Sequence, residues 1–339
     1  MRVFALIFCT LFSFHVLANS TAVTPGKLTG GKQSEHPDWF KESFLDIAGD
    51  VEEAAEAGKH VILFMHLNDC PYCAKMADEN FAHAPYTPFI RKNFDVIQIN
   101  IKGDREVAFD ENTSMSEKEL AKKKLKVRYT PTILFLNKEN KTVLRLNGYR
   151  SVPAFKHALD YVQQQAYLKT TLNQFIESQQ ASPVYTFRDH PMFKRVTDLS
   201  SAAKVPLALL FEDSSCDACN ELHDGHLSNP ETLKILENIT FVRLDANSED
   251  PIIDPEGNKT TAKAYAEKLG LTYRPGIVLF DKGKEIIRID GLLYTYHFQE
   301  VLRYVGERHY IKYPNNLHGY LGMRTETILK SGKSIDLSK

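Results

Sequence analysis

The chain has 339 residues, enough for two domains of ordinary size. Its hydrophobic content of 43% and charged content of 25% are ordinary for a globular protein and exclude a disordered or membrane-spanning composition. A formal net charge of −1 gives no reason to expect nucleic acid or an anionic membrane surface as the main partner.

The first 18 residues have the pattern of a secretory signal peptide. An apolar run from Val3 to Phe14 follows Arg2, and Val16-Leu17-Ala18 is a small-residue cleavage signal. The run is shorter than the roughly 20 residues that a spanning helix needs, and no later stretch is long and apolar enough. We expect residues 1–18 to be removed and the mature protein to be exported, soluble and periplasmic. Residues 19–34 predict a flexible entry segment.

A strand followed by two cysteines is the first strongly patterned feature. The apolar run that begins at Val61 predicts a strand buried on both faces. Asn68-Asp69 then suits a turn and a helix start, and Cys70 and Cys73 follow on the expected first turn of that helix. Their spacing puts both sulfurs on one side of the turn, within reach of a disulfide. Because a helix N-terminus stabilises a thiolate, the stretch predicts a redox centre.

The rest of the first half alternates between helix and strand, and the segment 102–119 has the polar composition of a loop. Its main predicted elements are a helix over Asp50–Ala57, a strand over Phe94–Ile101, a helix over Leu120–Lys126, strands over Ile133–Leu136 and Thr142–Leu146, and a closing helix over Ser151–Tyr167.

The second half repeats this order. The pair Cys70–Cys73 recurs 146 residues later as Cys216–Cys219, and Pro131 recurs 144 residues later as Pro275. A nearly constant offset predicts a tandem duplication. The predicted elements of the second copy are a strand over Leu207–Phe211, a strand over Ile239–Leu244, a polar insertion over 245–261, a helix over Ala262–Leu269, strands over Gly276–Phe280 and Glu285–Ile289, and a helix over Tyr296–Tyr310.

Each half has the order strand, CxxC helix, strand, helix, X-Pro-strand, hairpin strand, closing helix. With Cys-Pro-Tyr-Cys at 70–73 and Thr130-Pro131 entering a strand, this order resembles the thioredoxin fold. Exported thioredoxin-related proteins are the nearest comparison, in particular the SoxW-like group and the C-terminal domain of DsbD.

The resemblance implies an α/β protein with two tandem thioredoxin-fold domains. Each would have a central mixed sheet flanked by helices, with a polar insertion before the helix that precedes the expected cis-proline. The domains are expected at 35–167 and 188–312, with a linker at 168–187 and a C-terminal tail at 313–339.

Roles for the first site follow from position and from the family. Cys70 lies nearer the exposed helix start than Cys73, so we expect Cys70 to attack and Cys73 to resolve. The alternatives are a structural disulfide or half of a zinc site. In the family, the proline at Thr130-Pro131 is cis, and the adjoining backbone binds a substrate peptide as an added strand. Arg274-Pro275 occupies the same place in the second half.

Proton transfer needs a separate candidate. Cytoplasmic thioredoxins carry a buried aspartate six residues before the first cysteine, where this chain has Phe64 and Leu210. His66 and Glu212, each four residues before the first cysteine of its half, are candidates to accept or relay the proton of the resolving thiol. The alternative is that both are partly exposed loop residues.

The second cysteine pair differs in its charges. Asp217 lies between Cys216 and Cys219, and a neighbouring carboxylate raises a thiol pKa. Arg274 could offset that effect, so the second centre should differ from the first in redox poise. The alternative is a permanently closed disulfide. A zinc site joining both pairs would need face-to-face docking, and neither CxxC is followed by His as c-type haem attachment requires. We therefore expect no metal and no cofactor.

These features together predict a thiol-disulfide oxidoreductase of exported proteins. Its partners would be disulfide-bonded or thiol-containing exported proteins, and the SoxW-like resemblance implies the direction of reduction, with electrons from a membrane reductant of the DsbD kind. A second hypothesis is a binding or chaperone-like module with one structural disulfide and little turnover. A third, an endoplasmic-reticulum isomerase, is disfavoured because the chain ends Asp336-Leu337-Ser338-Lys339 without a retention signal.

Overall fold

The computed structural model describes residues 24–339, and the predicted signal peptide at 1–18 lies outside the described residues. In chain order the first half has β1 (Leu28–Thr29), α1 (Ile47–Glu56), β2 (His60–His66), α2 (Pro71–Met76), η1 (Ala77–Ala82), α3 (Thr87–Asn93), β3 (Phe94–Asn100), β4 (Glu106–Asp110), β5 (Thr113–Ser116), α4 (Glu117–Glu119), η2 (Leu120–Lys124), β6 (Thr132–Leu136), β7 (Thr142–Asn147), α5 (Val152–Gln163), η3 (Ala166–Leu168) and α6 (Leu172–Gln179).

The second half repeats the pattern and adds a C-terminal helix. Its elements are α7 (Leu199–Ala202), β8 (Leu207–Glu212), α8 (Cys219–Asp224), η4 (His226–Ser228), α9 (Pro230–Leu236), β9 (Thr240–Asp245), β10 (Pro251–Ile253), β11 (Lys259–Thr261), α10 (Ala262–Leu269), β12 (Gly276–Asp281), β13 (Lys284–Ile289), α11 (Thr295–Gly306), η5 (His309–Ile311), α12 (Leu317–Lys330) and β14 (Ile335–Asp336).

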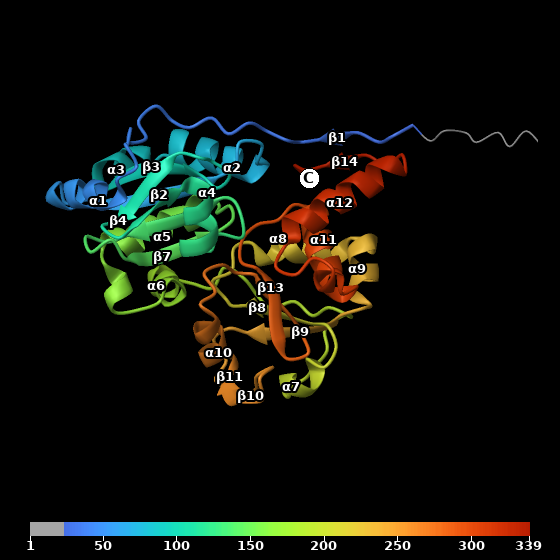
Figure 1. Cartoon of the computed structure of the whole chain (residues 1–339). Helices are drawn as coiled ribbons and strands as arrows, with labels where there is room; N and C mark the ends of the chain where they lie inside the picture. Colours follow the sequence, from blue (N-terminus) through green and yellow to red (C-terminus); the bar gives the residue numbers. More distant parts are fainter. Residues whose placement is uncertain (1–23) are drawn as a thin grey trace, which may run out of the picture.

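Two four-stranded mixed sheets form the centres of two domains that lie side by side (Figure 1). The strand order is β3-β2-β6-β7 in the first and β9-β8-β12-β13 in the second. In each sheet the first two strands are parallel and the remaining neighbours are antiparallel. The predicted fold class, two tandem α/β domains with a central mixed sheet, is confirmed by this shared topology.

Each sheet is covered on both faces, which explains the unbroken apolar strands. In β2, Ile62 and Phe64 pack with α2, α3 and α5, whereas Leu63 and Met65 pack with α1 and the β4–β5 hairpin. In the second domain α8, α9, α11 and α12 cover one face, and α7 and α10 cover the other. Because side chains alternate between faces, a strand buried on both sides needs apolar residues at every position.

The two polar insertions contain short hairpins, where the sequence predicted loops. Strands β4 and β5 pair antiparallel inside 102–119, and β10 and β11 pair antiparallel inside 245–261. Both hairpins are short and carry many polar side chains, so they lack the long apolar alternation by which a strand is recognised in a sequence.

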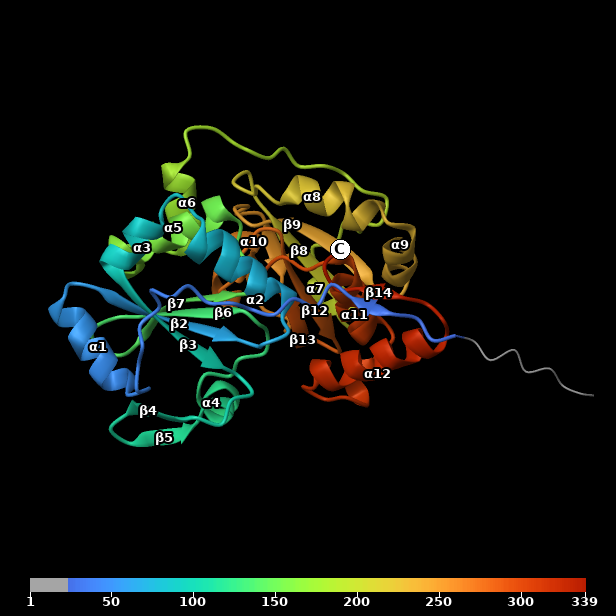
Figure 2. The same cartoon turned by 90° about the horizontal axis from the view of Figure 1, so that it is seen from above.

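The two ends of the described chain are paired with one another. Strand β1 pairs in parallel with β14, with Leu28 opposite Ile335 (Figures 1 and 2). The same segment continues to the first domain, where the Ser34 amide donates to the carbonyl of Asn68. Part of the segment that was predicted to be flexible is therefore a strand. A two-residue strand whose partner is about 300 positions away leaves no local sequence signal.

The domains dock through equivalent loops, those that follow β7 and β13. Tyr149 and Leu292 form an antiparallel bridge between these loops. The buried guanidinium of Arg150 donates to the carbonyl of Asp290 at 3.0 Å and to the hydroxyl of Thr272 at 3.1 Å. A Cβ on Gly291 would lie 2.3 Å from a backbone oxygen of the first domain, so only glycine allows this approach.

None of the helices in residues 24–339 is both long and apolar enough to cross a bilayer.

Candidate functional site

The first cysteine pair caps the helix that follows β2. Cys70 is the N-cap of α2, Pro71 is its first residue, and the amide of Cys73 donates to Cys70 Sγ at 3.1 Å. The two cysteines form a disulfide with their Cα atoms 5.2 Å apart. Cys70 is 7% exposed and Cys73 is fully buried, so Cys70 is the more exposed residue of the pair.

The loop before β6 lies directly against this disulfide. Cys70 Sγ is 3.5 Å from the carbonyl oxygen of Thr130 and 3.4 Å from its hydroxyl, which donates to the sulfur. The Thr130–Pro131 peptide is cis, as the resemblance implied, and so is Arg274–Pro275. Within residues 24–339 the backbone N–H of Thr130 has no hydrogen-bond partner. It is a free main-chain donor beside Cys70.

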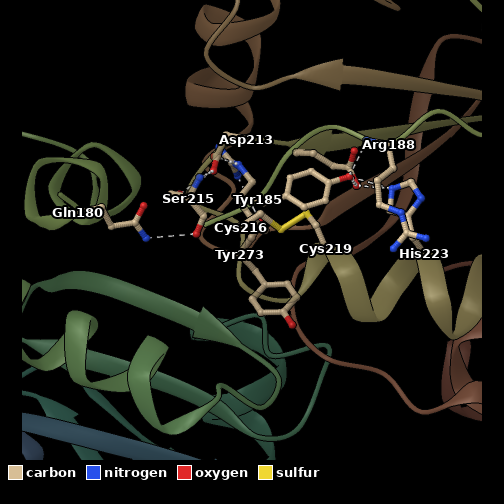
Figure 3. Close-up of a disulfide and its surroundings, with 11 residues drawn as sticks. Gln180, Tyr185, Arg188, Asp213, Ser215, Cys216, Cys219, His223 and Tyr273 are labelled. Atoms are coloured by element: carbon tan, nitrogen blue, oxygen red, sulfur yellow. Dashed lines mark hydrogen bonds and ion pairs between the residues drawn. A yellow bond between two sulfur atoms is a disulfide. The ribbon is translucent and has the colours of Figure 1, made fainter. Parts of the chain in front are cut away.

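The second cysteine pair is less exposed than the first, and Tyr185 lies beside its disulfide (Figure 3). Cys216 is 1% exposed and Cys219 is fully buried, and both pack against Tyr185 from the linker. Helix α8 begins only at Cys219, so Cys216 lies in the preceding turn rather than on the predicted first helical turn. The first pair has Pro71 to fix the helical start, whereas the second has Asp217 at that place.

A buried polar network lies beside the second disulfide. Glu212, fully buried at the end of β8, has Oε1 2.9 Å from His223 Nε2 and accepts from the hydroxyl of Tyr185 at 3.2 Å. Its second oxygen, Oε2, has no hydrogen-bond partner among residues 24–339. Glu212 is thus a buried strand residue, not a loop residue. The role of Glu212 in proton transfer stays a prediction.

The ion pair of Arg274 is with Asp213, a partner that the sequence did not indicate. Its Nε donates to Asp213 Oδ2 at 2.7 Å, and this ion pair is almost completely buried. Asp217, the acid that Arg274 was expected to offset, is exposed. Asp213 directly follows β8 and also accepts from Ser215, so its carboxylate is fixed where the arginine reaches it.

Comparison with known families identifies both halves. The Thioredoxin-like domain family matches residues 47–163 and 193–306, together more than half of the chain. The chain belongs to the thioredoxin-like family. Members of this fold that carry a CxxC pair are in general thiol–disulfide oxidoreductases, and this chain carries two such pairs. Comparison with curated proteins gave no match.

Solved structures similar to this chain include several redox proteins. A thioredoxin-fold protein from Helicobacter pylori is 26% identical over 36% of this chain and 84% of its own, with a TM-score of 0.32. A DsbH oxidoreductase is 18% identical over 46% of this chain and 95% of its own, with a TM-score of 0.25. Oxidised thioredoxin O2 from Arabidopsis thaliana is 16% identical over 32% of this chain and 95% of its own, with a TM-score of 0.24.

His66 of the first thioredoxin-like domain is buried among other aromatic rings. It is 5% exposed, lies 4.4 Å from the ring of His36 and stacks on Phe64. Burial, together with the positive charge that His36 can carry, lowers the pKa of His66 to about 4. The imidazole is therefore neutral at pH 7. Its close neighbours are these rings, so its proton-transfer role stays a prediction.

The buried state of His66 predicts an acid-sensitive first domain. The unfolded chain binds a proton on this histidine below about pH 6.5, whereas the folded chain does so only near pH 4. Stability should therefore fall as the pH drops through this window, by up to about 1.4 kcal/mol per pH unit for this group. The free energy of unfolding at each pH is measured by urea titration, with the fluorescence of Trp39 as the probe. His66→Phe keeps an aromatic ring and should flatten the slope; an equal slope in the variant would contradict the assignment.

Sequence reasoning missed Tyr294 and His297, two residues of the second domain that contact Tyr72 at the first site. The hydroxyl of Tyr72, between the two cysteines, accepts from the Tyr294 amide at 2.9 Å and lies 2.8 Å from His297 Nδ1. The Tyr72 and Tyr294 rings stack with their centroids 4.8 Å apart. These contacts join positions more than 220 residues apart, so only the docking of the two thioredoxin-like domains reveals them.

Proposed function

We propose that this chain is a thiol–disulfide oxidoreductase of exported proteins and that Cys70–Cys73 reacts with the substrate. The placement of Cys70 supports this most directly. Cys70 is the more exposed residue of the pair and caps a helix N-terminus, and its sulfur lies beside Thr130, whose N–H is free within residues 24–339. An extended substrate can pair with that N–H as an added strand and so bring its own sulfur to Cys70.

In the reducing direction, the reaction consists of two exchange steps. The Cys70 thiolate attacks one sulfur of the substrate disulfide, which forms a mixed disulfide and releases the first substrate thiolate to take up a proton. The Cys73 thiolate then attacks Cys70 Sγ, releases the second substrate thiolate and closes the Cys70–Cys73 disulfide. Two electrons have passed from the dithiol to the substrate. A dithiol reductant must then reopen the Cys70–Cys73 disulfide.

The proposed direction is reduction, with a membrane dithiol reductant of the DsbD kind as the electron source. It rests on the resemblance of Cys-Pro-Tyr-Cys and its surroundings to exported thioredoxin-related proteins of the SoxW-like group. Equilibration of the first pair with glutathione tests the direction. A reduction potential of about −270 mV supports a reductase, and values of about −180 to −120 mV support an oxidant or isomerase.

The activity itself predicts Cys70-dependent reduction of a protein disulfide. The protein, with dithiothreitol as electron source, should accelerate insulin reduction above the rate of dithiothreitol alone, because a thiolate held at a helix N-terminus attacks faster than a free thiol. Cys70→Ser should abolish the acceleration. The precipitation of the released insulin chain measures the rate. A variant as fast as the natural protein would contradict the proposal.

One observation favours a second candidate, a binding module with little turnover. Cys216 and Cys219 are covered by Tyr185 and are less exposed than Cys70, as a structural disulfide would be. In that case the thioredoxin-like folds would present clefts to a client and exchange few electrons. The insulin assay separates the two: binding without any Cys70-dependent turnover would favour the module.

A further inference from the structure

A cavity of about 200 Å³ opens at the first redox centre, between the two domains. Cys70 and Thr130 belong to its lining. This volume is far larger than a single water requires. It adjoins the sulfur that attacks the substrate in the proposed function, and this inference rests on that function.

The opposite wall of the cavity comes from other parts of the chain. The second domain and the C-terminal tail provide most of it, and the side chains they provide are largely apolar. These are Leu292, Leu293 and Val301 from the second domain, and Leu317, Leu321 and Leu337 from the tail.

The wall is held in place by buried polar contacts. Tyr320 on α12 is fully buried and donates to Glu300 of α11 at 2.6 Å, and Arg324 donates to the same carboxylate at 3.0 Å. These bonds fix the helix that carries Leu317 and Leu321, which are one turn apart on it. The part of the wall that the tail provides is therefore held on the second domain by hydrogen bonds.

We propose that this cavity binds an apolar side chain next to the reacting cysteine of an extended substrate segment. The second domain and the tail would then determine which protein disulfides Cys70 reduces. Three features support this occupant: the lining is largely apolar, Cys70 belongs to the wall, and a free main-chain donor at Thr130 lies beside it. Charged residues such as Asp69 and Arg288 also belong to the lining, but the wall that the leucines and Val301 form favours an apolar side chain over a polar one, because an apolar side chain loses no hydrogen bonds to water when it is buried there.

An extended segment fits better than the surface of a folded protein. Cys70 is only 7% exposed and lies between the domains, where a rigid convex surface cannot approach it. Only a single strand with side chains on alternating sides can pair with the Thr130 N–H and direct its neighbouring residue into the cavity. The substrate class is thus unfolded or locally unfolded exported protein with an apolar residue beside its cysteine.

Two matched peptides test the preference. Each carries one cysteine in mixed disulfide with 2-mercaptoethanol and has either Leu or Asn as the neighbouring residue. The pre-reduced natural protein should reduce the Leu peptide about tenfold faster in kcat/KM, the range typical of an apolar pocket. Leu321→Asn should lower that ratio to about twofold. The ratio is measured within one preparation, so it does not depend on how much of a variant is folded.

Thr327→Asn is the matched control, because Thr327 lies on the exposed side of the same helix and outside the cavity lining; its ratio should stay near tenfold. Equal rates for the two peptides with the natural protein, or an unchanged ratio in Leu321→Asn, would overturn the inference. Reduction of hydroxyethyl disulfide distinguishes a failure of this inference from a failure of the proposed function. If this small disulfide is reduced but the peptides show no preference, only the inference fails. If neither disulfide nor peptide is reduced, the proposed function fails with it.

Discussion

Replacing Cys73 with serine is expected to trap a mixed disulfide between Cys70 and a disulfide-bonded protein. In the natural chain Cys73 lies against Cys70, with its amide 3.1 Å from Cys70 Sγ, and is poised to displace the substrate. Serine cannot perform that second exchange, so the adduct should accumulate to about one equivalent per chain while turnover is lost. Non-reducing electrophoresis and intact-mass measurement of the pre-reduced variant with oxidised insulin would measure the adduct.

Cys219→Ser is the matched control for this experiment. It leaves Cys216 as a single thiol in the corresponding position, but Cys216 is 1% exposed beneath Tyr185. This variant should form little adduct through Cys216 and should keep the reduction that depends on Cys70. Equal trapping by the two variants would show that the second centre also meets substrate directly, contrary to the roles proposed for the two pairs.

Asp213→Ala is expected to destabilise the second domain strongly. The substitution leaves the guanidinium of Arg274, whose side chain is 8% exposed, without its charged partner. Removing one member of a buried ion pair typically costs about 3–5 kcal/mol, because the remaining charge stays desolvated and unpaired. It also removes the acceptor for both the amide and the hydroxyl of Ser215, next to Cys216.

Two probes locate that loss. Trp39, the single tryptophan of the chain, reports unfolding of the first domain, whereas far-UV circular dichroism reports both. In urea, the circular dichroism transition of Asp213→Ala should begin at lower concentration, and the Trp39 transition should move less. Asp224→Ala breaks the exposed pair between Arg188 and Asp224 and should leave both transitions in place. Equal effects of the two variants would contradict the prediction that the buried ion pair contributes more to stability than the exposed one.

Much of the fold is predictable because its signals are local or repeated. The apolar run at Val61 indicates a strand covered on both faces, and the nearly constant offset between the two cysteine pairs indicates the duplication. The predicted helix over Ala262–Leu269 has the bounds of α10. A helix start beside the first cysteine pair also follows from local pattern, but its exact place does not: the helix was expected to start at Asn68-Asp69, whereas it begins at Pro71, so Cys70 is its N-cap and not a residue of its first turn.

The rest of the site depends on side-chain direction and on docking, which a linear sequence does not encode locally. Arg274 was considered only for its electrostatic effect on the charge of Asp217, yet its side chain forms an ion pair with Asp213, four residues earlier. Tyr185 was part of a linker, yet it covers the second disulfide. The bond between Tyr72 and His297 exists only because two whole domains pack together. Each of these contacts is set by tertiary structure.

The pairing of β1 with β14 has a consequence for the order in which the chain matures. Leu28 precedes both thioredoxin-like domains in the chain, but its partner Ile335 follows both of them. Domains generally fold as units while synthesis proceeds, so both sheets can form before this final pair. The N-terminal segment that reaches Asn68, near the first cysteine pair, is thus secured only after residue 335 has been synthesised. A product that ends before residue 335 would carry Cys70 without this closing contact.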